Sequence, residues 1–261
     1  MRNDAFEKWC NLIYQGSGAI YFKNHVASND FIYNKNSLSS SEWVAAIKLS
    51  SNYANLNGVP GVVSSSSLCR KCNREKEIIA HVTGSCSSNN LLITARHHSG
   101  KNDLIELVRE KEYVCFNEVY AVDTEGRSRF SDIIAFDTKS NNAYIIDPTV
   151  RYETSDPEQD KKIREEKREI YEKCVPFYAE KYMASFGIRN WLVLGLWFGS
   201  RGCFGESVLD FIKQFKIDPC KLKDISESVL IKTIQIINSH PGWKKSLIPV
   251  TPKEERVLKK K

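Results

Sequence analysis

The amino-acid sequence predicts a mixed α/β fold in which a helix, three strands, a second helix and a fourth strand follow one another. Three apolar runs of strand length are separated by short turn-prone segments, a charged segment with helical spacing follows them, and a continuous apolar run comes next. The 261 residues, 41% of them hydrophobic, suffice for such a core with attached modules. We expect four parts: a helical linker-like region over 1–63, a cysteine-rich module over 64–100, the α/β core over 101–200, and C-terminal helices with a basic tail over 201–261.

A helix is predicted to begin after Ser39. Ser39 and Glu42 have the spacing of a capping box, in which each side chain bonds a backbone N–H of the other residue. Trp43, Ala46 and Ile47 then share one face, which indicates a packing helix of about three turns. Two glycines, a proline and four consecutive serines follow within 55–67, a composition typical of a connection between domains.

The core is predicted to begin with an amphipathic helix over 103–112, in which Asp103 suits the first turn. Three strands are expected over 113–122, 130–137 and 143–150. The connections between these strands are short, which favours antiparallel hairpins.

A long helix is expected over 157–183, although Pro176 should kink or interrupt it. The continuous apolar run over 191–198 is typical of a buried strand. Two more helical patterns, over 205–215 and 225–237, precede a tail that ends in three lysines.

Composition limits the class of protein. No apolar run reaches the roughly 18 residues of a membrane helix, and charges near the N-terminus interrupt any secretory signal. The eight cysteines form no evenly spaced disulfide framework. We therefore expect a protein that is not secreted, does not span a membrane and resides in a reducing compartment. The net charge of +6 favours a polyanionic partner, but 32 acidic residues are mixed among 38 basic ones, so charge alone decides little.

A zinc site is predicted from four residues with the spacing C-x2-C-x8-H-x4-C, namely Cys69, Cys72, His81 and Cys86. Three thiols and one imidazole can complete a tetrahedral zinc shell, leaving no position for a substrate water. The site should therefore be structural. The alternative is a chance grouping of reduced core cysteines with one hydrogen-bonded histidine.

Several basic residues around and after this module are candidates for contact with phosphate. For each one the alternative is an ordinary solvated surface position. The candidate nucleic-acid contacts are Arg70, Lys71, Arg74, Arg96, His97 and Arg129.

Two aspartates, Asp132 and Asp147, interrupt apolar strands, where a buried charge costs several kcal/mol unless a metal or a cation compensates it. Carboxylate oxygens are the ligands that Mg²⁺ prefers, and Mn²⁺ accepts the same ligands. Phosphodiester hydrolysis also needs a cation near the developing charge. Lys167 lies within the apolar stripe of the following helix and is the first candidate for that role, with Tyr171 one turn further on. The alternative for an aspartate at a strand end is to cap a turn, which suits Asp123 and Asp137 better.

Several segments of the sequence resemble those of a known protein family. The segments CRKCNREKEIIAHVTGSC, ARHH, RFSDIIAF, IIDPTV and EKREIY are similar to the C-terminal region of site-specific non-LTR retrotransposon polyproteins, which carries a CCHC zinc knuckle and a restriction-like endonuclease. The segments QGSGAIYF and SSSEWVAAIKL are also similar to the family's linker ahead of the knuckle. The resemblance covers most of the chain and implies a PD-(D/E)xK nuclease core, similar to that of archaeal Holliday junction resolvases.

The resemblance implies roles for single residues. Asp132 matches the aspartate of the PD motif, Asp147 the second metal-binding acid, Lys167 the displaced lysine on the following helix, and Tyr171 the tyrosine after it. The sequence departs from the pattern at Ser131, where the family often has proline. It departs also at Thr149, where many relatives in the wider superfamily have lysine, so the chemistry requires Lys167 to reach the site.

The family's endonuclease nicks target DNA, so the resemblance implies DNA as partner, element RNA as a second candidate, and the nucleus as location. No paired-aspartate box of a reverse transcriptase precedes the knuckle, so no polymerase activity is expected. A fragment, a truncated element copy and a host gene derived from an element all fit. The main rival is a catalytically silent nucleic-acid-binding protein, and a weaker one is a zinc-containing protein-interaction module. Two buried carboxylates favour the enzyme, since binding alone does not need them.

Overall fold

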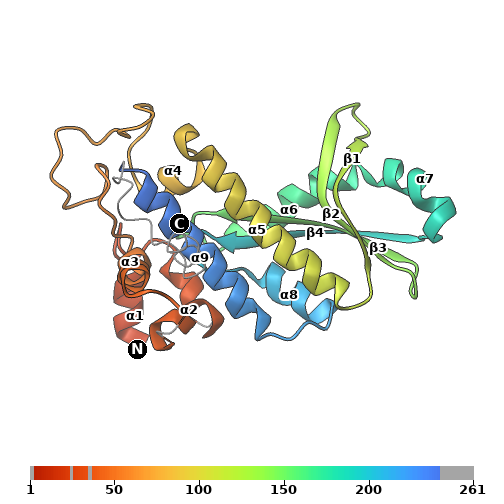
Figure 1. Ribbon diagram of the computed structural model, residues 1–261, viewed down its shortest axis with the longest axis horizontal. Helices are drawn as coiled ribbons and strands as arrows, with labels where there is room; N and C mark the ends of the chain where they lie inside the picture. The colour runs from red at the N-terminus through yellow and green to blue at the C-terminus, as the bar shows by residue number, and fades with distance from the viewer. Residues whose placement is uncertain (1–2, 24–25, 35–36, 242–261) are drawn as a thin grey trace, which may run out of the picture.

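The computed structural model describes residues 3–23, 26–34 and 37–241. A four-stranded mixed sheet lies between helices on both of its faces, and a helical region adjoins one end of this core (Figure 1). The α/β class predicted from the sequence is confirmed. The basic tail expected at the C-terminus lies outside the described residues.

The sheet is formed by β1 (Val114–Val122), β2 (Ser128–Asp137), β3 (Asn142–Arg151) and β4 (Asn190–Gly199), in that spatial order. The pairs β1–β2 and β2–β3 are antiparallel, as the short connections predict, and β3–β4 is parallel. All four strands lie within two residues of their predicted bounds.

Aspartates stabilise both hairpin turns, as the sequence indicated. The Asp123 carboxylate accepts backbone N–H bonds from Glu125 and Arg127, and Asp137 accepts one from Lys139. Asp132 and Asp147 therefore stand out as the strand aspartates without a turn to cap.

Helix α5 (Asn90–Arg109) begins thirteen residues before the predicted helix and ends three residues before its predicted end. Asp103 consequently lies in the middle of the helix and not in its first turn, which corrects the prediction. The reason lies in buried polar side chains: Arg96 and Lys101 are each only 1% exposed. They occupy inward positions and so conceal the apolar period by which a helix is recognised.

The predicted long helix is two helices, α6 (Gln159–Glu172) and α7 (Val175–Phe186), with Pro176 in the first turn of the second. The interruption expected at Pro176 is confirmed. Both helices cover one face of the sheet, where Tyr171, Tyr178 and Tyr182 pack on Ile134 and Ile145. The opposite face is covered by α5 and α8 (Glu206–Gln214).

The second helical region combines the two ends of the chain. Helices α2 (Val26–Tyr33), α3 (Ser40–Ser50) and α4 (Ile79–Gly84) pack around α9 (Lys221–Ser239), which runs alongside α5 (Figure 1). The capping box of Ser39 and Glu42 at the start of α3 is confirmed. The remaining short elements are α1 (Asn3–Cys10), η1 (Ala19–Phe22) and η2 (Ser87–Asn89).

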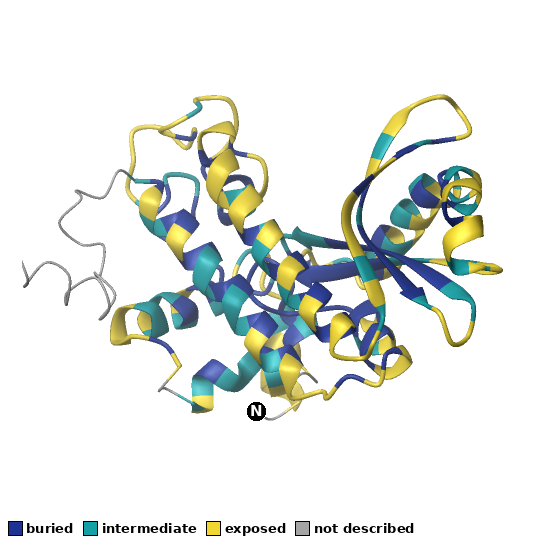
Figure 2. Ribbon diagram, turned by 45° about the vertical axis from the view of Figure 1, so that its right-hand side comes forward, coloured by how far each residue is buried: buried dark blue, intermediate teal, exposed yellow. Residues whose placement is uncertain are grey.

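Buried and exposed residues are distributed unevenly over these elements. The strand centres are buried, whereas the β1–β2 hairpin and the loop before α4 are largely exposed (Figure 2). Leu56 and Val59, within the predicted connection, are nevertheless buried against α3 and α9. Among the described residues, no helix has both the length and the apolar character to cross a membrane.

Candidate functional site

Asp132 of β2 and Asp147 of β3 lie on adjacent strands, at the end of the segment over which the two strands pair. The paired residues of β2 and β3 end at Ile133 and Ile146, and each of these is next to one of the acids in the sequence. Asp132 contacts His97 of α5 and Asp147 contacts Lys167 of α6, and the two acids are close enough for the charge of Asp132 to raise the pKa of Asp147. The fold therefore brings together the two acids that the sequence singled out.

Lys167 of α6 faces Asp147. Its Nζ lies 2.8 Å from Asp147 Oδ1, and the two side chains are 16% and 4% exposed. Ile163 and Cys174, which share its helical stripe, are buried as well. The lysine thus points into the protein, as its place in the apolar stripe indicated.

Burial raises the pKa of Asp147, the nearby Lys167 ammonium opposes this rise, and the negative charge of Asp132 adds to it. The Asp147 carboxylate consequently depends on a positive charge beside it. In the structure that charge is Lys167, and a divalent cation would serve the same need.

We expect Lys167→Met to lower the free energy of unfolding by about 3 kcal/mol at neutral pH, because it leaves the Asp147 carboxylate buried without its cation. Urea denaturation measures the change. The double variant Lys167→Met/Asp147→Asn should recover at least half of the loss, since no unpaired charge then remains. A single variant as stable as the wild type would show that Lys167 does not compensate Asp147.

Gly195 of β4 allows α6 to approach the sheet at this point. It pairs with Asp147 in the parallel register, and a Cβ added to it would lie 2.7 Å from Cβ of Lys167 and 3.2 Å from Cα of Arg164. Any larger residue would displace the helix that carries Lys167. Gly195 was not among the predicted site residues, although a glycine inside an apolar strand often marks a place where another segment of the backbone approaches the strand closely.

We expect Gly195→Ala to destabilise the protein by about 1–3 kcal/mol, because the added methyl group cannot be accommodated without moving α6. Thermal or urea unfolding measures this effect. The matched control is Gly100→Ala in α5, where an added Cβ meets no atom within 4 Å and helix propensity favours alanine by up to about 1 kcal/mol. Equal effects of the two substitutions would contradict the close approach.

Tyr171 and His97 border the two acids. The Tyr171 hydroxyl donates to the backbone carbonyl of Phe130 at 3.1 Å. Burial, together with the charge of Asp147, raises the pKa of Tyr171, so this side chain remains a hydrogen-bond donor. His97 Nε2 lies 3.3 Å from Asp132, which places His97 beside the acids, at a position 30% exposed.

Glu118 of β1 also lies beside Asp132, although it was not among the predicted site residues. The β1–β2 register sets it between the pairs Asn117–Ile133 and Val119–Ser131 and therefore opposite Asp132. Its φ of 52° is unusual within a strand, and its carboxylate accepts a hydrogen bond at 2.5 Å from the buried Lys101. Only the backbone conformation and the register single it out, and neither is visible in the sequence.

The second site is a Cys3His cluster that could hold a metal ion. The ligand atoms of Cys69, Cys72, His81 and Cys86 all lie within 4.8 Å of one another. Cys69 Sγ is 3.8 Å from Cys86 Sγ, and Cys72 Sγ is 3.2 Å from His81 Nε2. Two thiolates bound to a tetrahedral zinc at about 2.3 Å would be roughly 3.7 Å apart, so the cluster has dimensions that fit zinc.

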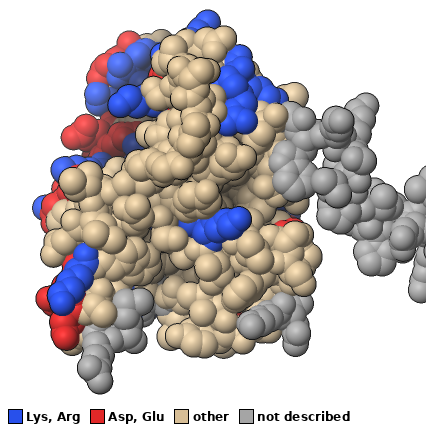
Figure 3. All heavy atoms as spheres, turned by 90° about the vertical axis from the view of Figure 1, so that its left-hand side faces the viewer, with Lys and Arg blue, Asp and Glu red and all other residues tan. Residues whose placement is uncertain are grey.

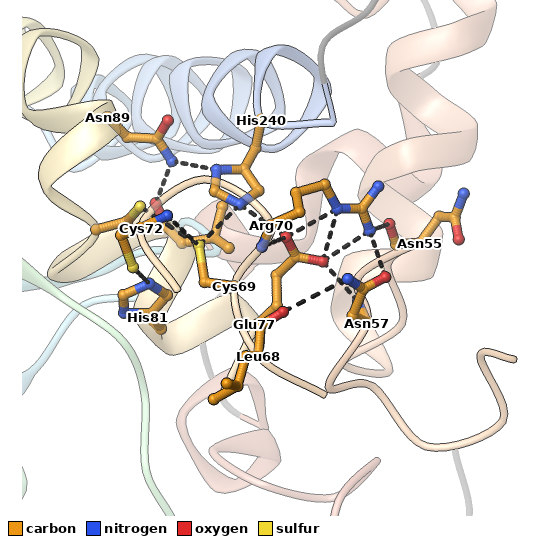
Figure 4. Close-up of polar contacts among 12 residues, drawn as sticks. Asn55, Asn57, Leu68, Cys69, Arg70, Cys72, Glu77, His81, Asn89 and His240 are labelled. Atoms are coloured by element: carbon orange, nitrogen blue, oxygen red, sulfur yellow. Dashed lines mark hydrogen bonds and ion pairs between the residues drawn. The ribbon is translucent and has the colours of Figure 1, made fainter. Parts of the chain in front are cut away.

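The loop between the first two cysteines and α4 is a tight hairpin that a buried carboxylate holds. Glu77 is fully buried and accepts hydrogen bonds from the backbone N–H groups of Asn57 and Arg70 and from the Arg70 guanidinium (Figure 4). Burial would raise the pKa of Glu77, but the hydrogen bonds from Arg70 and Asn57 lower it to about 2. Arg70 is thus committed to the hairpin, although part of it remains exposed.

The residues predicted to contact nucleic acid occupy different environments. Arg96 is 1% exposed and donates to the Thr83 carbonyl and to Thr233 Oγ1. It joins α4 to α9, so its prediction as a surface contact is wrong. Arg129 forms an ion pair with Asp123. Lys71 and Arg74 are exposed.

One end of the molecule carries few charged side chains on its surface (Figure 3). At the end of the molecule formed by the N-terminal helices and the loop before α4, most of the visible surface is uncharged. Lys and Arg side chains gather toward its upper edge (Figure 3).

His240 lies beside the Cys3His cluster and was not among the predicted site residues. It directly follows α9, is fully buried, and lies 3.4 Å from Cys69 Sγ and 3.0 Å from Glu77 Oε1 (Figure 4). It is separated from the cluster by more than 150 residues, so no local spacing could reveal it.

No protein-family model matches this chain, and no curated protein matches it significantly.

Proposed function

We propose that this chain is a Mg²⁺- or Mn²⁺-dependent endodeoxyribonuclease of the retrotransposon restriction-like type, which nicks target DNA. One observation supports this proposal most: Asp132 and Asp147 lie on adjacent strands, close enough for their charges to interact, with Lys167 of the next helix 2.8 Å from Asp147. Two acids and an amine at one point are the groups that phosphodiester hydrolysis with a divalent ion requires.

The proposed PD-(D/E)xK core rests on the element order and on the place of the lysine. Helix α5, strands β1 to β3, helices α6 and α7 and strand β4 follow one another, which is the order that the resemblance implies when α6 and α7 are taken as one interrupted helix. Thr149 stands where many relatives have lysine, and Lys167 supplies the missing ammonium from α6.

A divalent ion held by the two acids would polarise the scissile phosphate and lower the pKa of an attacking water. Asp132 and Asp147 would provide its oxygen ligands. Lys167, released from its ion pair once the ion compensates Asp147, would stabilise charge that develops on the phosphate. Tyr171 would fix the position of α6 relative to β2, beside the acids, through its hydrogen bond to the Phe130 carbonyl oxygen. His97, as a neighbour of Asp132, would orient that carboxylate.

For the Cys3His cluster we propose structural zinc. All four positions are protein ligands, and the donor atoms lie close enough for one tetrahedral ion. The exposed Lys71 and Arg74 beside the ligands would then contact phosphate. Such a knuckle would position DNA, or element RNA, relative to the two acids, and the proposed location is the nucleus.

Plasmid nicking tests this function. The purified chain should convert supercoiled plasmid to the open circular form with Mg²⁺ or Mn²⁺ and should stop when EDTA is added. Tight binding to DNA without nicking, with either ion, would favour the catalytically silent binding protein instead.

A further inference from the structure

We propose that His240 is a positioning residue of the metal centre: its Nε2–H donates to the Cys69 thiolate and joins the end of α9 to the knuckle. This inference rests on the proposed zinc site, and it assigns a role to a side chain outside the predicted ligand set.

The hydrogen bonds of the imidazole define which nitrogen carries the proton. Asn89 Nδ2 lies 2.9 Å from the Val82 carbonyl oxygen and 3.0 Å from His240 Nδ1. Because the carbonyl can only accept, the amide nitrogen of Asn89 faces both partners as a donor, and Nδ1 of His240 must accept. The proton of the neutral ring therefore lies on Nε2.

Nε2 in turn faces two acceptors. Cys69 Sγ is 3.4 Å away and Glu77 Oε1 is 3.0 Å away. His240 and Cys69 are both fully buried, so no water competes for this N–H. A hydrogen bond shared between a thiolate and a carboxylate holds the thiolate in one orientation, as partners of ligands commonly do in metal sites.

Electrostatics favours the same arrangement. Three thiolates around one Zn²⁺ leave a net negative charge, which needs hydrogen-bond donors when it is buried. Besides Nε2 of His240, the backbone N–H of Cys72 donates to Cys69 Sγ. The carboxylate of Glu77 adds a further negative charge, and the Arg70 guanidinium pairs with it.

The consequence concerns α9. This helix packs on α2, α3, α4 and α5, and two buried polar links tie it to the knuckle: His240 to Cys69, and Thr233 through Arg96 to the Thr83 carbonyl. Metal binding should therefore order the last turns of α9, although α9 lies at the other end of the sequence.

Zinc transfer to a chromophoric chelator tests the proposal, using the full chain loaded with zinc. The matched pair is His240→Gln and His240→Asn, because a glutamine amide nitrogen stands near the position of Nε2 and an asparagine nitrogen near that of Nδ1. We expect His240→Asn to release zinc at least about tenfold faster than the wild type, and His240→Gln to remain within about threefold. The control His98→Asn makes the same change at an exposed histidine and should not alter the rate.

Hydrogen exchange of α9 gives a second readout that needs no substitution. On removal of zinc from the wild type, amide protection over residues 233–239 should fall. Zinc release from His240→Asn at the wild-type rate, or full protection of α9 in the zinc-free wild type, would overturn the proposal. Metal analysis of the wild type separates this outcome from failure of the proposed zinc site: a chain that takes up no zinc contradicts the latter.

Discussion

Asp132→Asn and Asp147→Asn should each lower metal-dependent nicking by at least about a thousandfold, equivalent to roughly 4 kcal/mol of transition-state stabilisation. Each substitution removes one anionic oxygen ligand and keeps the shape of the side chain. The two acids lie on adjacent strands and have different neighbours, His97 beside Asp132 and Lys167 beside Asp147, so neither can replace the other. Initial nicking rates on supercoiled plasmid, at saturating Mg²⁺, measure the effect.

The control for these variants is Asp137→Asn. Asp137 also belongs to β2, but it is the last residue of the strand and accepts hydrogen bonds within its own turn, so this substitution should change nicking less than about threefold. Circular dichroism and thermal melting should show that all three variants fold. If the wild type and both site variants nick DNA at the same rate, the activity belongs to a contaminant and the proposed function loses its basis.

The regular part of the core could be predicted because local patterns and tertiary packing agree there. Each strand is an apolar run between turn signals, and Pro176 marks the break between α6 and α7. Helix α5 could not be placed correctly, because its inward face carries Arg96 and Lys101. Arg96 bonds Thr83 and Thr233, and Lys101 bonds Glu118. Such partners come from distant segments, so a buried cation in the sequence looks like a surface one.

The candidate sites divide in the same way. Asp132, Asp147 and Lys167 could be found because a charge within an apolar pattern is visible locally, and the four ligands of the cluster because their spacing is. Glu118 could not be found, because only the register of the sheet places it beside Asp132. His240 could not be found either, because only the position of the end of α9 places it beside Cys69. Gly195 lies between these cases: the glycine is visible, but the helix that approaches it is not.

Removal of zinc should unfold the region around residues 69–86 and leave the sheet folded. Structural zinc sites contribute on the order of 10 kcal/mol to the folding of small modules, and the hairpin of the knuckle has few apolar contacts of its own. Without metal, burial raises the pKa of Cys86 to about 11, so this thiol is protonated at neutral pH, and the link that a bound metal provides between the four ligands is lost. The apolar side chains that cover the two faces of the sheet belong to other clusters.

The cysteines themselves can report this result. After chelation we expect Cys69, Cys72 and Cys86 to react rapidly with a thiol reagent, at least about a hundredfold faster than in the loaded chain. Cys174 and Cys203 are fully buried in the core and should stay protected, whereas the exposed Cys220 should react in both states. Mass spectrometry of the labelled peptides distinguishes the three groups. Equal reactivity of the knuckle thiols with and without chelator would contradict the zinc site, and simultaneous exposure of Cys174 would show that the knuckle and the sheet unfold as one unit.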